Sequence, residues 1–209
     1  MRRLEPQRED RSARWVLASA SPRRAELLRG AGQRFEVEPS RVDEARRSGE
    51  GALDFAGRVA REKATEIAAR RPGWWILAAD TIVIVDGDPL GKPIDADDAV
   101  RMLVRLSGHV HEVATAFVLL DPEARVFVDR TVRTEVLFGS LERTAIDAYV
   151  ATGEPLDKAG AYAIQGGARS FVADLRGSLS NVIGLPMAEV EQALRSAGLW
   201  TDTVPDPVR

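Results

Sequence analysis

The sequence has no cysteine and no long apolar run. The absence of cysteine among 209 residues excludes disulfide bonds, thiolate metal ligands and a cysteine nucleophile. No apolar stretch reaches the length of a membrane-spanning helix, and the basic residues at the start are not followed by the apolar segment of a signal peptide. We therefore expect a cytoplasmic protein with no membrane partner.

Aromatic side chains and excess positive charge are also scarce. Aromatic residues make up 6% of the chain, and the formal net charge is −3. Duplex nucleic acid is usually bound through a basic face, and single strands are bound through aromatic residues beside basic ones. We therefore expect no duplex nucleic acid partner, and a site for any other anion has to be local.

The rest of the composition is that of a folded protein. The chain has 44% hydrophobic and 29% charged residues and is long enough to bury a large core, in one domain or a two-lobed one. Residues 1–12 are predicted to be a flexible arm and 200–209 a flexible tail, which leaves 13–199 as the folded part.

Strand-like and helix-like stretches alternate along the chain. Strands are predicted at 14–19, 34–39, 74–85, 111–121 and 124–138, and helices at 22–29, 53–70, 141–152 and 187–197, with another helix after Asp95. Residues 161–186 are expected to hold strands broken by glycines. The order predicts an α/β protein. The two long strands that meet at Asp121-Pro122 indicate a hairpin, so the sheet should be mixed rather than all-parallel.

Helical spacing also predicts which side chains face the core. Asp95 is expected to cap a helix whose inner face includes Leu103 and Val104. In the helix predicted at 141–152, one face is expected to be formed by Leu141, Ala145, Ile146 and Tyr149.

The loop after the first strand combines several groups that bind phosphate. Pro22 occupies the first position of the following helix and Ser21 the capping position. The helix N-terminus supplies free N–H groups, while Ser19, Arg23 and Arg24 add a hydroxyl and two guanidinium groups. These features favour a phosphate cradle. An ordinary capped helix with two solvated arginines is the alternative.

Two charged residues lie where apolar ones are expected. Asp80 interrupts a buried strand, where an unpaired carboxylate is costly. It could bind a divalent metal or accept a proton from water, or it could be a structural partner of an arginine. Lys63 lies four residues from both Val59 and Ile67, on the same apolar helix stripe. It could therefore reach phosphate oxygens from a cleft wall or extend to the rim.

Three further positions give weaker signals. Lys92 is presented by a loop that Gly91 and Pro93 constrain. Glu44 could add a metal-binding carboxylate, although exposed loop acids are often only solvated. Gln165 offers an amide beside glycines, which suits recognition of a nucleobase but also fits a plain turn.

Five short motifs occur in the order seen in Maf-family proteins. They are SASPRR at 19–24, REKA at 61–64, AADTIV at 78–83, LGKP at 90–93 and GEPLDKAGAYAIQG at 153–166. The similarity runs from about residue 15 to the final helix and covers nearly everything except the two tails. On these motifs the chain resembles the Maf family.

The resemblance implies a nucleoside triphosphate pyrophosphatase, which releases pyrophosphate and a nucleoside monophosphate. It implies an elongated α/β fold like that of the inosine-triphosphatase superfamily, with a mixed sheet flanked by helices in two lobes and a central cleft. It also implies a homodimer and a divalent cation, Mg²⁺ or Mn²⁺, as cofactor.

The resemblance also assigns roles to individual residues. Asp80 matches the family's proton acceptor, and Glu44 matches a metal partner that acts together with Asp80. The positions that match phosphate-facing residues of the family are Ser19, Arg24, Lys63 and Lys92.

Three positions bear on the nucleobase. Arg23, Thr81 and Gln165 match the branch that resembles dTTP/UTP pyrophosphatases, whereas the 7-methyl-GTP branch usually has another residue in place of Arg23. Two alternatives belong to other classes. One is a nucleotide-sensing regulator of cell division with little turnover. The other is a single-strand RNA-binding module, for which the aromatic content is low.

Overall fold

The computed structural model describes residues 14–202. The predicted arm at 1–12 and residues 203–209 of the predicted tail lie outside this range. The strands are β1 (Trp15–Ala18), β2 (Glu36–Val37), β3 (Trp75–Val85), β4 (Asp88–Leu90), β5 (Val110–Leu120), β6 (Val126–Phe138) and β7 (Val172–Arg176). The helices are α1 (Pro22–Gly30), α2 (Ala52–Arg70), α3 (Ala96–Leu106), α4 (Arg143–Ala151), α5 (Leu179–Ile183) and α6 (Met187–Ser196), with 3-10 helices η1 (Glu154–Asp157), η2 (Ala159–Ala161) and η3 (Gly167–Phe171).

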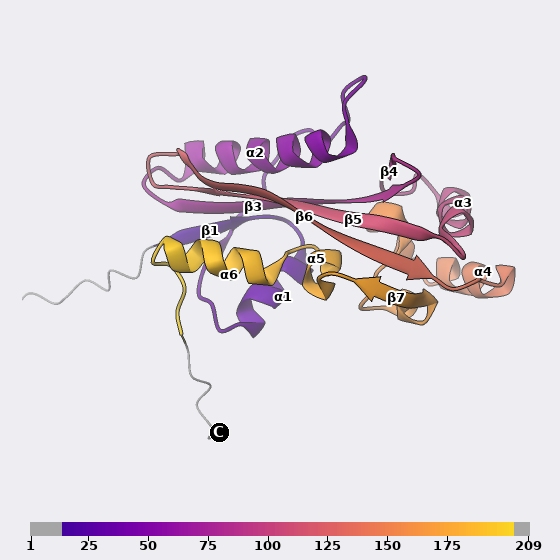
Figure 1. Ribbon diagram of the computed structural model, residues 1–209. Helices are drawn as coiled ribbons and strands as arrows, with labels where there is room; N and C mark the ends of the chain where they lie inside the picture. Colours follow the sequence, from indigo (N-terminus) through magenta and orange to yellow (C-terminus); the bar gives the residue numbers. More distant parts are fainter. Residues whose placement is uncertain (1–13, 203–209) are drawn as a thin grey trace, which may run out of the picture.

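All seven strands form one elongated mixed sheet (Figure 1). The order is β2, β1, β3, β5, β6, β7, and β4 pairs with β3. The strands β1, β2 and β3 are parallel to one another, whereas β3, β5, β6 and β7 pair antiparallel. The predicted hairpin of two long strands is β5 and β6. The mixed α/β sheet flanked by helices is therefore confirmed.

Helices cover both faces of one half of the sheet (Figure 1). The helix α2 packs small residues such as Ala56, Ala60 and Ala64 against one face, where Ile76 and Ala78 of β3 are fully buried. The helices α1 and α6 cover the opposite face, against Leu77 and other odd-numbered residues of β3. The short alanine side chains let α2 lie close to the sheet. The alternation follows from the two-residue period of a strand.

The other half of the sheet carries a separate hydrophobic cluster. The helices α3 and α4 lie at this end (Figure 1), and the cluster is built around Leu103, Leu106, Phe138, Ile146 and Phe171. Aromatic side chains pack edge to face within it, as Phe138 does against Phe171. The elongated sheet thus carries one hydrophobic cluster at this end and two at the other end, one on each face.

Several predictions of local structure need correction. The side chain of Val104 is half exposed and Ala145 is exposed, because the inner faces of α3 and α4 are formed by Leu103 with Leu106 and by Ile146 with Tyr149. The capping role of Asp95 is confirmed, since its side chain accepts a hydrogen bond from the backbone N–H of Asp98.

The segment 161–186 is mostly turns rather than broken strands. Only β7 is extended there, and the rest forms η3, α5 and loops. The backbone bonds locally in this part: the N–H of Gly166 donates to the carbonyl of Ala163, and the N–H of Arg169 donates to the carbonyl of Gly166. At the C-terminal end Thr201 exchanges two hydrogen bonds with the amide of Gln33, so the folded part extends beyond the predicted boundary at residue 199.

One edge of β3 is paired in two separate places. On its other edge β5 pairs continuously from Ile76 to Ile84. On this edge β1 pairs with residues 75–78 and β4 with residues 83–85. Among the described residues, 14–202, no strand therefore pairs with residues 79–82 on that side. This gap is called the notch below.

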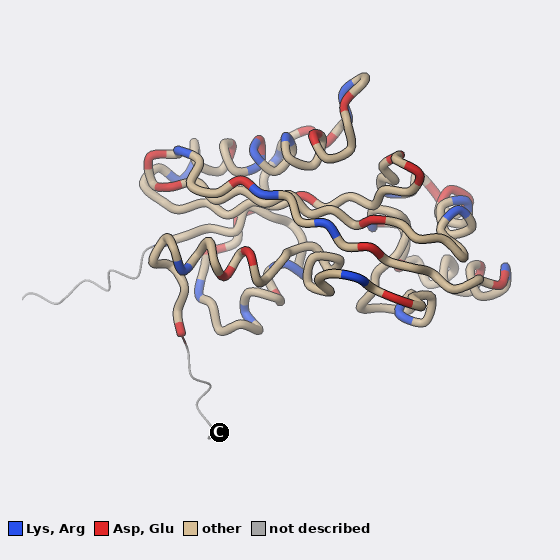
Figure 2. The backbone as a smooth tube through the Cα atoms, viewed as in Figure 1, with Lys and Arg blue, Asp and Glu red and all other residues tan. Residues whose placement is uncertain are grey.

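Acidic and basic residues are interspersed along the helices and strands (Figure 2). Many of them pair at helical spacing or across neighbouring elements, as Arg143 does with Asp147 and Arg61 with Asp129. Within residues 14–202 no helix is long and apolar enough to span a membrane.

A buried histidine of β5 packs edge to face against Phe138 and Tyr162 in the hydrophobic cluster near α3 and α4. His111 is only 2% exposed and its Nε2 atom is 2.8 Å from the hydroxyl oxygen of Tyr162, while Nδ1 has no hydrogen-bond partner among the described residues. Burial lowers the pKa of His111 from 6.5 to about 4. The ring is therefore neutral in the folded protein at pH 6, where much of the unfolded chain would carry the proton.

This difference predicts a pH dependence of stability. Because the unfolded chain takes up the proton first, the free energy of unfolding should fall as the pH decreases from 6.5 towards 4, by at most about 1.4 kcal/mol per pH unit. Urea unfolding of wild-type protein and His111→Phe between pH 7 and pH 5 measures the effect. The slope should be smaller in His111→Phe and unchanged in the exposed control His109→Asn. Equal slopes in all three proteins would contradict the assignment.

Candidate active site

A cavity of about 340 Å³ opens at the notch of β3. Its walls come from the loop after β1, from α2, β3 and α5, and from the segment 157–165. All of the predicted site residues line it: Ser19, Arg23, Arg24, Glu44, Lys63, Asp80, Thr81, Lys92 and Gln165. A volume of this size is typical of small-ligand sites. The structure therefore brings the predicted residues together around one cavity.

The strand β3 sends two neighbouring side chains to opposite faces of the sheet at the notch. Asp80 belongs with Ala78 and Ile82 on the face covered by α2, so it meets Lys63. Thr81 points to the other face, where its hydroxyl contacts Arg24. No strand covers this edge of β3, so both residues also border the cavity.

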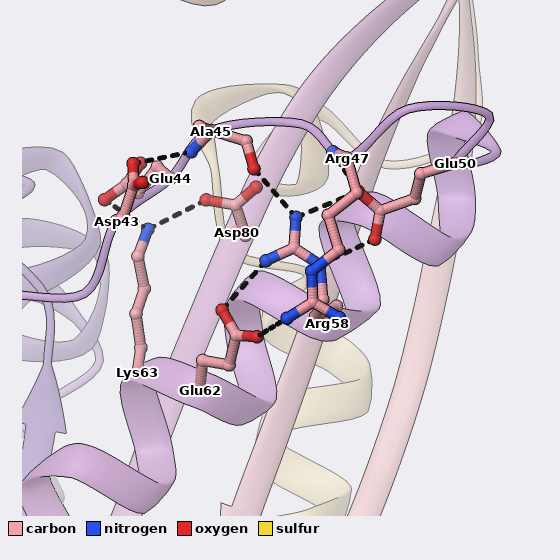
Figure 3. Close-up of polar contacts among 9 residues, drawn as sticks. All are labelled: Asp43, Glu44, Ala45, Arg47, Glu50, Arg58, Glu62, Lys63 and Asp80. Carbon is pink, nitrogen blue, oxygen red and sulfur yellow. Dashed lines mark hydrogen bonds and ion pairs between the residues drawn. The ribbon is translucent and has the colours of Figure 1, made fainter.

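Lys63 joins two carboxylates at the floor of the cavity (Figure 3). Its Nζ atom is 2.8 Å from Oδ1 of Asp80 and 2.9 Å from Oε1 of Glu44. The side chains of Lys63 and Asp80 are 8% and 10% exposed, whereas that of Glu44 is 49% exposed. The prediction that Lys63 points inward from the apolar stripe of α2 is confirmed. Its ammonium group balances the buried charge of Asp80.

Arg24 closes the other side of the notch and is almost completely enclosed. Its guanidinium group donates to the carbonyl oxygens of Ala79 and Gly184, at 2.8 and 2.7 Å. It also donates to the hydroxyls of Ser19 and Thr81, at 3.2 and 2.9 Å. The carbonyl of Ala79 is the group that a neighbouring strand would otherwise bond, so Arg24 takes the place of the missing strand. Burial lowers the pKa of Arg24.

These contacts distinguish the two neighbouring arginines. Four of the five guanidinium N–H groups of Arg24 are used within the protein, which leaves it less able to bind a ligand than the sequence suggested. Arg23 borders the same cavity, and its side chain has no hydrogen bond or ion pair to any residue from 14 to 202. Of the two arginines of the SPRR motif, Arg23 is thus the one whose guanidinium group is not engaged by these contacts.

The start of α1 faces the cavity with its backbone donors. Ser21 has the extended backbone of a capping residue, as predicted, but its side chain makes no capping hydrogen bond. The N–H of Ser21 instead donates to the hydroxyl of Ser19. The first N–H groups of α1 therefore have no side-chain acceptor in the cap, and residues 21–24 line the cavity.

The rim on the far side carries Lys92 and Gln165. Both side chains belong to exposed residues on loops that border the cavity. The turn that holds Gln165 is fixed by Glu154, whose carboxylate accepts a hydrogen bond from the N–H of Gly167 at 3.1 Å. A Cβ atom at Gly166 would lie 1.6 Å from this carboxylate, so a larger residue there would force the Glu154 side chain to move.

Lys158 is a cavity residue that the sequence analysis did not place in the site. Its neighbour Asp157 forms an ion pair with it, and both residues line the cavity. Their position inside the motif at 153–166 is the signal that could have identified them. Ser40 lines the opposite wall and has no comparable sequence signal.

The carboxylates of the cavity fit one type of metal site. Within residues 14–202, no three His, Asp or Glu side chains are grouped to hold a metal ion. Mg²⁺ in nucleotide-dependent enzymes commonly uses one or two carboxylates together with phosphate oxygens. Glu44 and Asp80 fit this pattern, because both reach the same Lys63 nitrogen from one side of the cavity.

Comparison with known proteins agrees with the family motifs in the sequence. The family model described as Maf-like protein matches residues 14–197. A dTTP/UTP pyrophosphatase of Geobacter sulfurreducens is 52% identical over 185 residues, which cover 88% of this chain and 97% of the relative. A dTTP/UTP pyrophosphatase of Anaeromyxobacter dehalogenans is 54% identical over 187 residues, covering 88% of this chain and 94% of the relative. The chain therefore belongs to the family of Maf-like proteins.

A dTTP/UTP pyrophosphatase of Myxococcus xanthus is 50% identical and covers 88% of this chain and 92% of the relative. Among solved structures, the chain is similar to a HAM1 protein from Coxiella burnetii, with 12% identity, a TM-score of 0.48 and coverage of 88% of this chain and 99% of that chain.

The different surroundings of the two arginines predict different costs of substitution. In Arg24→Lys a single ammonium group replaces the planar guanidinium group and cannot reach all four acceptors at once. The free energy of unfolding should therefore fall by about 2–4 kcal/mol. In Arg23→Lys it should change by less than about 0.5 kcal/mol. Urea unfolding at pH 7 compares the two variants. Equal losses would contradict the structural role of Arg24.

Proposed function

We propose that this protein is a nucleoside triphosphate pyrophosphatase whose substrates are dTTP and UTP, the nucleotides named for its relatives. The observation that carries the proposal is the cavity itself. Two carboxylates, Glu44 and Asp80, lie at its floor, and cationic side chains surround them. This arrangement suits a ligand that carries several phosphate groups and has to be attacked by water.

Cations from both sides of the cavity bind the triphosphate. Arg23 and the first N–H groups of α1 approach from the near wall, and Lys92 from the rim opposite. Lys63 and Lys158 add charge at the floor and at the far wall. Arg24 contributes by holding Ser19 and Thr81 in place rather than through a free donor of its own.

Asp80 accepts a proton from the attacking water. The water oxygen forms a bond to the α-phosphorus while the bond from this phosphorus to the bridging oxygen breaks, and pyrophosphate leaves with the electron pair. Lys63 holds the carboxylate of Asp80 through one oxygen, Oδ1, which leaves the other oxygen for the proton. The growing charge on pyrophosphate is balanced by Arg23 and Lys92.

Glu44 and Asp80 would hold a Mg²⁺ or Mn²⁺ ion, which when bound neutralises charge on the phosphate oxygens. A homodimer and a cytoplasmic location complete the proposal. Support for the location is the chain's lack of cysteine, and support for the dimer is the family resemblance.

The activity is tested with a panel of triphosphates in the presence of Mg²⁺ or Mn²⁺. Wild-type protein should release nucleoside monophosphate and pyrophosphate, with dTTP and UTP as the best substrates. In isotopically labelled water the label should appear in the monophosphate, because the α-phosphorus is attacked. Preference for 7-methyl-GTP would assign the other branch. Tight nucleotide binding with negligible turnover would contradict the enzymatic proposal and would favour a regulator of cell division.

The role of Asp80 predicts the effect of one substitution. Asp80→Asn keeps the shape but cannot accept the proton, so turnover should fall roughly 10²- to 10⁴-fold. Nucleotide binding, measured by calorimetry, should persist. Asp86→Asn, at an exposed turn after the same strand, is the control and should retain full activity. Near-normal pyrophosphate release from Asp80→Asn would show that another group takes the proton.

Gln165 is the proposed reader of the nucleobase, because its amide offers a donor and an acceptor at the rim. Gln165→Ala should reduce the ratio of kcat/KM for dTTP over dCTP about tenfold, which corresponds to the loss of one hydrogen bond. Gln192→Ala, on the exposed face of α6, is the matched control. A uniform loss of activity on every nucleotide would contradict a role in base selection.

A further inference from the structure

The loop that carries Glu44 has no regular secondary structure. It connects β2 to α2 and runs alongside the part of α2 that carries Arg58, Glu62 and Lys63 (Figure 3). Such a loop has to be held by side-chain contacts if it is to place a carboxylate within 2.9 Å of Lys63. Its own residues offer few such contacts at Glu44, which is half exposed. A residue outside the loop therefore has to hold it in place.

Arg58 of α2 contacts the loop at two places. Its Nε and Nη2 atoms donate to the two carboxylate oxygens of Glu50, at 2.6 and 2.9 Å. Its Nη2 atom also donates to the backbone carbonyl of Ala45, the residue next to Glu44, at 3.0 Å. The side chains of Arg58 and Glu50 are only 13% and 11% exposed. This paired, largely shielded geometry differs from that of ordinary surface ion pairs, which contribute little.

The same arginine is anchored on its own helix. Its Nη1 atom donates to Glu62, one helical turn further along α2, at 2.9 Å. Glu62 also pairs with Arg47 of the loop, and Glu50 accepts a hydrogen bond from the backbone N–H of Arg47. The loop and α2 are thus joined by a closed network centred on Arg58 (Figure 3). The hydrogen bond from Arg58 lowers the pKa of Glu50 to about 2, so Glu50 stays charged at neutral pH.

The position of Arg58 on α2 separates it from the cavity. It precedes Lys63 by five residues, which places the two side chains about 140° apart around the helix axis. Lys63 therefore faces the cavity, while Arg58 faces the side where the loop passes, and Arg58 does not line the cavity. Any effect of Arg58 on the reaction has to act through the loop.

We propose that Arg58 is a positioning residue that holds the loop at Ala45 and Glu50 and so fixes the carboxylate of Glu44 beside Lys63 and Asp80. The proposal deepens the proposed function and rests on it for the consequence on turnover, but the structural part stands on the contacts alone. Release of the loop allows Glu44 to move away from Lys63, because about half of its side chain is exposed. A displacement of about 1 Å in a catalytic constellation can cost on the order of 10²-fold in rate.

The structural part is tested by hydrogen exchange without any substrate. In wild-type protein the backbone N–H groups of Ala45 and Arg47 have acceptors within the loop, and they should exchange slowly. In Arg58→Ala the exchange in residues 41–50 should become at least about tenfold faster, while that of β3 stays unchanged. Arg61→Ala is the matched control, because Arg61 lies on the same helix, is more exposed and pairs with Asp129 away from the loop. Unchanged exchange in Arg58→Ala would overturn the proposal.

The catalytic consequence is tested with a double-mutant comparison. Arg58→Ala should lower kcat about 10- to 100-fold, and Arg58→Lys should not restore it, since a lysine cannot hold both oxygens of Glu50 and the carbonyl of Ala45. If Arg58 acts through Glu44, adding Arg58→Ala to Glu44→Gln should cause little further loss. Additive losses would show that Arg58 acts by another route.

One further variant and the activity of the wild-type protein show which part of the proposal fails, if either does. Glu50→Gln weakens the same contact from the loop side, so it should reproduce the faster exchange even if Arg58→Ala folds poorly. If wild-type protein hydrolyses no triphosphate, the proposed function fails, whereas the exchange experiment still decides whether Arg58 holds the loop. Full activity in Arg58→Ala together with faster exchange would show that the position of Glu44 does not matter for turnover.

Discussion

The structure depends on one buried charge, the carboxylate of Asp80 in the middle of β3. A carboxylate at this depth is tolerated only with a cation and hydrogen bonds beside it, and Lys63 supplies the cation from the facing helix. The contact requires α2 to lie close to the sheet, which its alanine residues permit. It also requires that no strand cover β3 at this point. The gap in strand pairing that lets Asp80 border the cavity is also the gap at which the cavity forms.

The gap in the sheet has a second consequence on the opposite face. A strand edge without a partner leaves carbonyl groups unbonded, and Arg24 satisfies the one at Ala79 while it joins α1 to the turn at Gly184. Two cations thus stabilise one interruption in different ways. Lys63 balances the charges of Asp80 and Glu44 at the cavity, whereas Arg24 replaces backbone hydrogen bonds and becomes part of the framework.

The sequence predicts the parts of this arrangement that depend on local periodicity. The strand that carries Asp80, the inward direction of Lys63 and the hairpin of β5 and β6 all follow from spacing, and they are confirmed. Contacts between distant segments could not be predicted in this way. Arg24 and Gly184 are 160 residues apart, so no pattern around SPRR distinguishes the buried Arg24 from the partly exposed Arg23. The loop contacts of Arg58 were missed for the same reason, since nothing near Glu44 specifies which helix residue it meets.

The charge of the cavity explains how an acidic protein can hold an anion. The chain has a net charge of −3, yet the cavity is lined by five cationic side chains and three carboxylates. Lys63 and Lys158 are paired with carboxylates, and Arg24 is bonded to carbonyl and hydroxyl groups. Within residues 14–202 this leaves Arg23 and Lys92 as the cations at the cavity without an ion-pair partner. A local excess of positive charge in a cleft concentrates anions even when the whole protein is negative. These two residues are therefore the cations that remain available to an anion in the cavity, whereas Lys63 is already engaged by Asp80 and Glu44.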